Sequence, residues 1–95
     1  MKIGNLSELD GWFEFKTEMV KAFPQFFDML FAKHSDLKPK EIKICALLFL
    51  DCNTKDIAGK LGMEPPSVDK ARSRLRKKFN LSEDGNLNSY LQKLK

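Results

Sequence analysis

The sequence contains few histidines and cysteines, the residues that build zinc sites and, for cysteine, disulfides. It has one histidine, His34, and two cysteines, Cys45 and Cys52, among 95 residues. The cysteines lie seven positions apart, within or at the end of one expected helix. A disulfide framework or a zinc site needs more cysteine or histidine ligands at short spacing. We therefore expect reduced cysteines, no metal site and no cofactor.

Long apolar runs are also missing from the chain. No stretch approaches the ~18–20 apolar residues of a membrane-spanning helix, and residues 1–10 lack the apolar core of a signal peptide. We therefore expect a cytoplasmic protein with no membrane partner. Glycine and proline are few, at five and four residues. A chain of 95 residues can form one small hydrophobic core but has no room for an elaborate active site. We therefore expect no enzymatic activity.

Positive charge is concentrated in one segment. Residues 54–80 hold eight basic and three acidic residues, a local charge of +5. The rest of the chain holds nine basic and ten acidic residues, a charge of −1, so this segment accounts for the whole excess of +4. Such a distribution favours a polyanionic partner.

The spacing of apolar residues predicts an all-α fold. They recur at three- and four-residue steps, and β-branched residues are too sparse for strands. The helix that starts at Pro39 is apolar on nearly all sides, which predicts that it is the central element of the domain. We expect helices over about 7–22, 24–34, 39–50, 54–61, 65–79 and 86–94.

Aromatic residues gather in the first two expected helices. Six of the eight phenylalanines and the single tryptophan lie within residues 12–31. Ser7 is the expected N-cap of the first helix. The side chains of that helix expected to face the core are Leu9, Trp12, Phe13, Met19, Val20 and Phe23. Core packing accounts for the aromatic stripe of Trp12, Phe13, Phe23, Phe27 and Phe31, but its size also allows a homodimer interface within residues 12–31, or docking on an upstream domain.

Residues 54–79 have the layout of a helix-turn-helix. Thr54 can cap a short helix, Gly62 can end it, and Pro65 with Pro66 can open the next, because prolines are tolerated in a first helical turn. The second helix has an apolar stripe made of Val68, Ala71, Leu75 and Phe79. Its opposite half carries Asp69, Lys70, Ser73, Arg74 and Lys77, and the seam between the two is flanked by Arg72, Arg76 and Lys78.

Several short stretches form a recognisable combination. They are Leu37-Lys38-Pro39-Lys40-Glu41-Ile42, Thr54-Lys55-Asp56-Ile57-Ala58, Ser67-Val68 and Arg74-Leu75-Arg76-Lys77-Lys78-Phe79. Together they resemble the LuxR/GerE-type DNA-binding domain of bacterial transcription regulators, over roughly residues 37–81. The resemblance implies a four-helix DNA-binding domain over residues 37–95. Residues 1–36 would then be an N-terminal helical extension that serves dimerisation or connects to an upstream sensor domain.

The resemblance also implies roles for particular residues. Asp69, Lys70 and Ser73 would face bases from a recognition helix over about 66–79. The candidates for phosphate contacts are Lys55, Arg72, Arg74, Arg76 and Lys77. Asp69 can either accept a hydrogen bond from a cytosine amino group or repel phosphate and so narrow the choice of site. Lys38 stands where the family usually has a Thr or Ser cap, and Ala71 stands where His is common.

These observations predict sequence-specific binding of double-stranded DNA and regulation of transcription. The recognition helix would enter the major groove, and dimerisation on repeated half-sites would raise the affinity of so small a domain. The alternative is a protein-interaction module whose helical surface docks a signalling partner or RNA polymerase.

Overall fold

The structure, a computed structural model, describes residues 9–81 and 85–94, and within them it contains six α-helices and no strand. The all-α prediction is therefore confirmed. The helices are α1 (Leu9–Ala22), α2 (Phe26–Lys33), α3 (Pro39–Phe49), α4 (Thr54–Leu61), α5 (Pro65–Lys78) and α6 (Leu87–Gln92). The expected N-cap Ser7 and the side chain of Leu9 lie outside the described part of the chain. No helix in the described ranges is both long enough and apolar enough to cross a bilayer.

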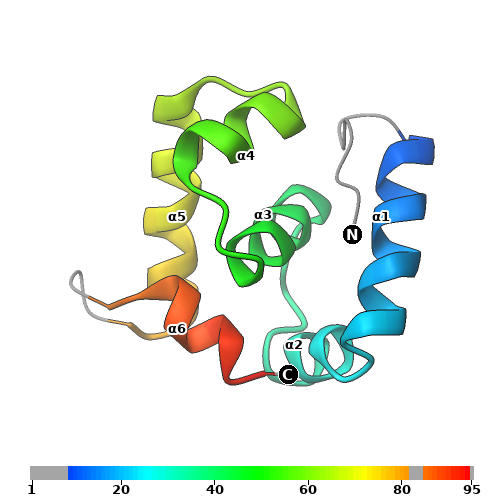
Figure 1. The fold of residues 1–95 in the computed structure, drawn as a ribbon. Helices are drawn as coiled ribbons and strands as arrows, with labels where there is room; N and C mark the ends of the chain where they lie inside the picture. Colours follow the sequence, from blue (N-terminus) through cyan, green and yellow to red (C-terminus); the bar gives the residue numbers. More distant parts are fainter. Residues whose placement is uncertain (1–8, 82–84, 95) are drawn as a thin grey trace.

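Helix α3 occupies the centre of the molecule, as its all-round apolar character predicts (Figure 1). Every side chain over residues 44–49 is buried. The helix starts at Pro39, whose lack of an N–H costs nothing in a first turn. Glu41 Oε1 accepts a hydrogen bond from the backbone N–H of Lys38 at 2.9 Å. The start of α3 is thus fixed by a carboxylate in its first turn, and no Thr or Ser at position 38 is needed.

The first two helices bury a narrower face than the sequence predicts. In α1, Phe15 and Met19 are buried, whereas Phe13 is 68% exposed and Val20 is 43% exposed. The prediction merged two neighbouring apolar stripes and overlooked Phe15. Trp12, Phe15, Met19 and Phe23, at steps of three and four, form the stripe that meets the core, and Phe13 and Val20 lie about 100° away from it. The expectation that Phe13 and Val20 face the core is therefore wrong.

Helix α2 shows the same division of its apolar residues. Phe26, Phe27 and Leu30 are buried, but Met29 and Phe31 are exposed at 39% and 38%. The expectation of a buried Phe31 is wrong, because it lies on the outer side of the helix. Its ring stacks on that of Phe27 with centroids 6.0 Å apart.

Aromatic contacts join the N-terminal helices to the end of α3. The ring of Phe49 lies 4.8 Å from that of Phe23 and 4.4 Å from that of Phe26, measured between centroids. Residues 9–33 therefore contribute to the same hydrophobic core as the helices that follow.

A second cluster fixes the C-terminal end of α5. The ring of His34, just after α2, lies 4.1 Å from that of Phe79, which in turn stacks on Tyr90 of α6 at 5.0 Å. His34 Nε2 and the Tyr90 hydroxyl share a hydrogen bond of 2.6 Å. Burial lowers the pKa of His34 below its ordinary value of 6.5, outweighing the opposite effect of Asp36. The lowered pKa favours the neutral ring, which packs against Phe79 and Tyr90.

The two cysteines are unpaired. Cys45 is buried within α3, and burial raises the pKa of its thiol to about 12. Cys52 is half-buried after α3, and burial raises its pKa as well. Neither thiol is activated as a nucleophile, because a reactive cysteine needs a lowered pKa.

Candidate nucleic-acid interface

Helix α4 is capped by Asn53, one residue before the expected cap. The Asn53 side chain accepts a hydrogen bond from the backbone N–H of Asp56 at 2.8 Å. Thr54, the expected cap, is the first residue of the helix, and its hydroxyl contacts α5 instead. Asn53 and Thr54 are adjacent, and both residue types are common N-caps. Asn53 serves as the cap because its side-chain carbonyl accepts the hydrogen bond from an N–H of the first turn.

The turn between α4 and α5 depends on Gly62. Its φ of 64° and ψ of 37° lie in the left-handed region, where glycine is favoured because it has no Cβ. The N–H of Met63 donates to the carbonyl of Ala58 at 2.9 Å, which closes the end of α4. Pro65 and Pro66 then occupy the first turn of α5, as predicted. The short helix, sharp turn and longer helix of a helix-turn-helix are all present in this segment.

Helix α5 has the two faces that its spacing predicts. Val68, Leu75 and Phe79 are buried, and Ala71 is half-buried beside them. The opposite side chains are all exposed: Asp69, Lys70, Ser73, Arg74 and Lys77. The seam residues Arg72, Arg76 and Lys78 are half-buried. Burial of the apolar stripe against the core thus turns the polar half of α5 toward solvent.

Two of the predicted site residues brace α4 against α5. Arg72 Nη1 donates to the Thr54 hydroxyl at 2.8 Å, and this hydroxyl donates to Asp69 Oδ1 at 3.2 Å. The Nε atom of Arg72 is buried. Arg72 and Asp69 therefore hold the angle between the two helices, and their polar groups are less available to a ligand than those of their neighbours.

Arg76 is also partly engaged within the protein. Its Nε donates to the carbonyl of Gly85 at 3.3 Å, which links α5 to the segment before α6. The remaining guanidinium nitrogens have no contact of this kind among the described residues, so the side chain can still present charge at the seam.

Lys78 joins the end of α5 to the start of α3. Its Nζ lies 2.8 Å from Glu41 Oε1, 3.4 Å from the carbonyl of Asp36 and 4.0 Å from its carboxylate. Glu41 is only 8% exposed, and its same oxygen accepts from the N–H of Lys38. This ion pair sets the distance between the two helices.

Replacing Glu41 with glutamine is expected to lower the free energy of unfolding by about 1–2 kcal/mol at neutral pH, because the amide can cap α3 but cannot pair with Lys78. Burial by itself raises the pKa of Glu41, but the hydrogen bonds from Lys38 and Lys78 outweigh it and hold this pKa below its ordinary value of 4.5. The unfolded state therefore binds the proton more readily. The stabilisation is complete above pH 4.5 and is lost as the pH falls through the lowered pKa.

Urea unfolding of both proteins from about pH 7 down to about pH 3 checks this expectation. The gap in stability between wild type and Glu41→Gln should close below pH 4.5. A gap that stays constant over this range would show that the ion pair does not contribute as described.

The exposed basic residues of α5 have no acidic partner among the described residues. Lys70, Arg74 and Lys77, which we call the α5 basic face, form no ion pair within the part of the chain that the structure describes. Lys55 is likewise exposed, in the first turn of α4. Lys55, Ser73 and the α5 basic face are thus all exposed to solvent on the helix-turn-helix.

A groove lies between the start of α3 and the α5 basic face. It has a volume of about 700 Å³, and Ile44, Met63 and Ala71 contribute apolar side chains to its lining. Its basic lining residues are Lys38, Lys40, Lys70, Arg74, Lys77 and Lys78. Glu41 is the one carboxylate among the lining residues, and it is paired with Lys78. The groove is therefore strongly positive.

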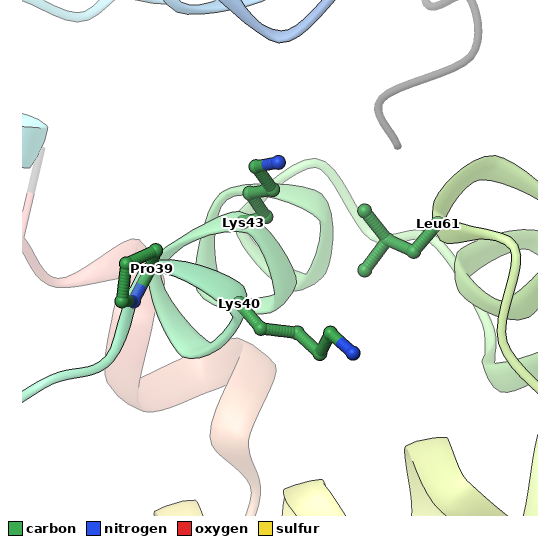
Figure 2. Close-up of a pocket in the computed structure, with 4 residues that line it drawn as sticks. All are labelled: Pro39, Lys40, Lys43 and Leu61. Carbon is green, nitrogen blue, oxygen red and sulfur yellow. The ribbon is translucent and has the colours of Figure 1, made fainter. Parts of the chain in front are cut away.

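Sequence reasoning missed Lys38 and Lys40 as site residues. Lys40 also lines a smaller adjoining pocket of about 340 Å³ with Pro39, Lys43 and Leu61. Figure 2 shows Lys40 and Lys43 leaving α3 in different directions, with Leu61 of α4 across the pocket. Lys43 is occupied elsewhere, because its ammonium lies 5.5 Å from the centre of the Trp12 ring. The only signal in the sequence was the pair of lysines beside Pro39, and nothing in it placed them next to α5.

Comparison of the chain with protein-family models, with curated proteins and with solved structures finds no match. Within the described residues, no group of three or more His, Cys, Asp or Glu side chains is arranged to hold a metal ion. The functional argument therefore depends on the geometry and charge of the surface around α5.

Proposed function

We propose that this chain is a sequence-specific DNA-binding domain of a transcription regulator, with α5 as the recognition helix. One observation carries the proposal. The α5 basic face is exposed and lacks acidic partners in the described structure, and it belongs to the second helix of a helix-turn-helix. The resemblance of residues 37–81 to the LuxR/GerE-type domain supports the same function.

Phosphate contacts would supply most of the affinity. An α-helix with its side chains is about 10–12 Å wide, and the major groove is about 12 Å wide. The groove is therefore wide enough to admit α5. Cations on α5 and Lys55 would then release counterions from the DNA backbone. Lys70 and Ser73, near the centre of the exposed face, would meet base edges and supply sequence preference.

The internal contacts of the helix-turn-helix support this division of roles. Because Thr54, Asp69 and Arg72 hold α4 on α5, the binding surface is rigid before DNA arrives. A rigid surface loses less conformational entropy on binding. A single domain of this size would still bind weakly, and a dimer on repeated half-sites would reach higher affinity.

The salt dependence of binding to a generic duplex tests the proposal. Fluorescence anisotropy of a labelled duplex, titrated with the protein from about 50 to about 200 mM salt, should give a log–log slope of about −4 to −7, for roughly five to eight phosphates. No binding at about 50 mM salt, even at high protein concentration, would overturn it.

A second candidate function rests on the outer face of α1. Phe13 and Val20 are exposed there and line a groove of about 310 Å³ together with Lys16, Thr17 and Lys21. Exposed apolar side chains at one place favour a protein partner, which can be a second copy of this chain, an upstream sensor domain or RNA polymerase. This function is compatible with DNA binding through α5.

Replacing Phe13 with serine separates the two functions. Phe13 lies on α1, apart from α4 and α5 (Figure 1), so duplex affinity of the isolated domain should stay unchanged while any self-association weakens. Anisotropy with a generic duplex and sedimentation velocity of the free protein measure the two effects. Loss of duplex affinity on this change, with folding intact, would place the DNA surface on α1 and contradict the assignment to α5.

A further inference from the structure

The two long edges of α5 are flanked by different helices. On one edge, Asp69 and Arg72 contact Thr54 at the start of α4. On the other edge, Arg74 and Lys78 line the groove that the start of α3 forms with α5. Lys70 and Lys77 lie between the two edges on the helix surface, and both also line the groove. Helix α5 is therefore bordered on one side by the start of α4, where exposed Lys55 follows Thr54, and on the other by Lys38 and Lys40 of α3.

This arrangement matters because the major groove has two walls. Each wall is a phosphate backbone, and a helix that enters the groove has one backbone on either side of it. The elements that flank the helix on both edges consequently approach phosphates of different strands. The sequence-based candidates supply cations on α4 and on α5 itself, but none on α3.

We infer that Lys38 and Lys40 bind the second phosphate backbone of a DNA duplex, opposite the backbone approached by Lys55. The inference rests on the proposed function and extends it to a site on α3. Both lysines are exposed and form no ion pair within the described ranges, so their charge is available. Three further basic side chains, Lys70, Arg74 and Lys77, line the same groove, in addition to Lys78, which is paired with Glu41. Such a surface suits a continuous row of phosphates.

The Glu41–Lys78 ion pair holds this second site in place. It ties the start of α3 to the end of α5, and the aromatic cluster of His34, Phe79 and Tyr90 supports the same end of α5. The distance from Lys38 and Lys40 to the α5 basic face is thus set by packed and paired residues. When α5 enters the major groove, Lys38 and Lys40 are therefore held at a fixed position beside it.

The test compares a double variant with a control of equal charge. Lys38→Gln/Lys40→Gln removes two cations, while the backbone N–H of residue 38 still donates to Glu41. Lys33→Gln/Lys93→Gln removes two exposed lysines from the last turn of α2 and from the end of α6. Circular dichroism and thermal melting of both variants confirm that the helices remain. Anisotropy with a generic duplex from about 50 to about 200 mM salt then gives affinity and salt slope.

One phosphate contact contributes about 0.9 to the slope of log affinity against log salt. A tenfold fall in salt concentration, from about 1 M to about 100 mM, therefore raises the affinity by roughly eightfold for each contact. Lys38→Gln/Lys40→Gln should therefore lose about 8- to 60-fold in affinity, for one or two contacts, with a slope less steep by about 0.9–1.8. The control should match wild type.

Each other outcome overturns the inference in a distinguishable way. If wild type binds the duplex and Lys38→Gln/Lys40→Gln binds equally well, the α3 site is wrong and the α5 assignment stands. If wild type does not bind the duplex, both proposals fail. A labelled polyglutamate peptide is titrated in parallel. Loss of peptide binding with unchanged duplex binding would show that the groove accepts an acidic protein segment and not DNA.

Discussion

Replacing Lys70, Arg74 and Lys77 together with alanine is expected to lower the affinity for a generic duplex by about 60- to 500-fold at about 100 mM salt. The lower figure corresponds to the loss of the two phosphate contacts of Arg74 and Lys77, at roughly eightfold each, and the upper figure adds a loss of similar size for the base contact of Lys70. The slope of log affinity against log salt should become less steep by about 1.8, for two phosphate contacts. All three side chains are exposed and lack ion pairs in the described structure, so their removal should leave folding intact.

The control for this variant changes the net charge equally at other places. Lys21, Lys33 and Lys93 are exposed, at the ends of α1 and α2 and just after α6. Their replacement with alanine should leave both affinity and slope near the wild-type values. If the two triple variants lose affinity equally, binding depends on net charge alone, and the α5 basic face is not the contact surface.

Replacing Leu75 with alanine is expected to lower the free energy of unfolding by about 2–5 kcal/mol. Leu75 has no exposed surface and belongs to the apolar stripe that holds α5 on the core. Truncation removes buried methyl groups and leaves a cavity that close packing cannot fully close. In a domain of this size, each kcal/mol shifts the melting temperature by about 4–8 °C. The variant should therefore melt about 8–40 °C below wild type.

Ser73→Ala is the matched control for this substitution. Ser73 is exposed two residues before Leu75 on the same helix, so its change should alter stability by at most about 0.5 kcal/mol. Thermal and urea unfolding followed by circular dichroism measure both variants. Similar stability of Leu75→Ala and Ser73→Ala would contradict the described packing of α5, and with it the orientation of the basic face.

Much of the fold could be predicted because local rules and packing agree in this chain. The prolines at 39 and 65 mark the starts of α3 and α5, and Gly62 marks the end of α4. These residues restrict the backbone whatever the tertiary context. The all-round apolar run of α3 predicted its central position, since such a helix must be covered on several sides.

The inward face of α1 could not be predicted in the same way. This helix carries apolar residues on two neighbouring stripes, and helical spacing alone does not say which stripe meets the core. Phe15 was overlooked, and Phe13 was placed in the core, because tertiary contacts such as that of Trp12 with Phe27 of α2 decide which stripe is buried. The spacing of apolar residues in α1 is thus compatible with either stripe facing the core, and tertiary packing decides between them.

The candidate site shows a similar limit. The spacing on α5 was sufficient to separate Lys70, Arg74 and Lys77 from the buried stripe. The spacing does not indicate which residues of different helices are in contact. The hydrogen bond from Arg72 to the Thr54 hydroxyl could therefore not be predicted. Lys38 and Lys40 lie 30 to 39 positions before the α5 basic face in the chain, yet they line the same groove. This proximity depends on how α3 packs, which no local pattern encodes.

The most direct test of the central claim maps the DNA surface residue by residue. Backbone amide shifts of the ¹⁵N-labelled protein are followed by NMR while a short duplex is added at low salt. DNA binding through the helix-turn-helix predicts that the largest changes fall on Lys55 and on the exposed residues of α5, with small changes along α1. Largest changes at Phe13 and its neighbours on α1, or no changes anywhere at excess duplex, would contradict the assignment of α5 as the recognition helix.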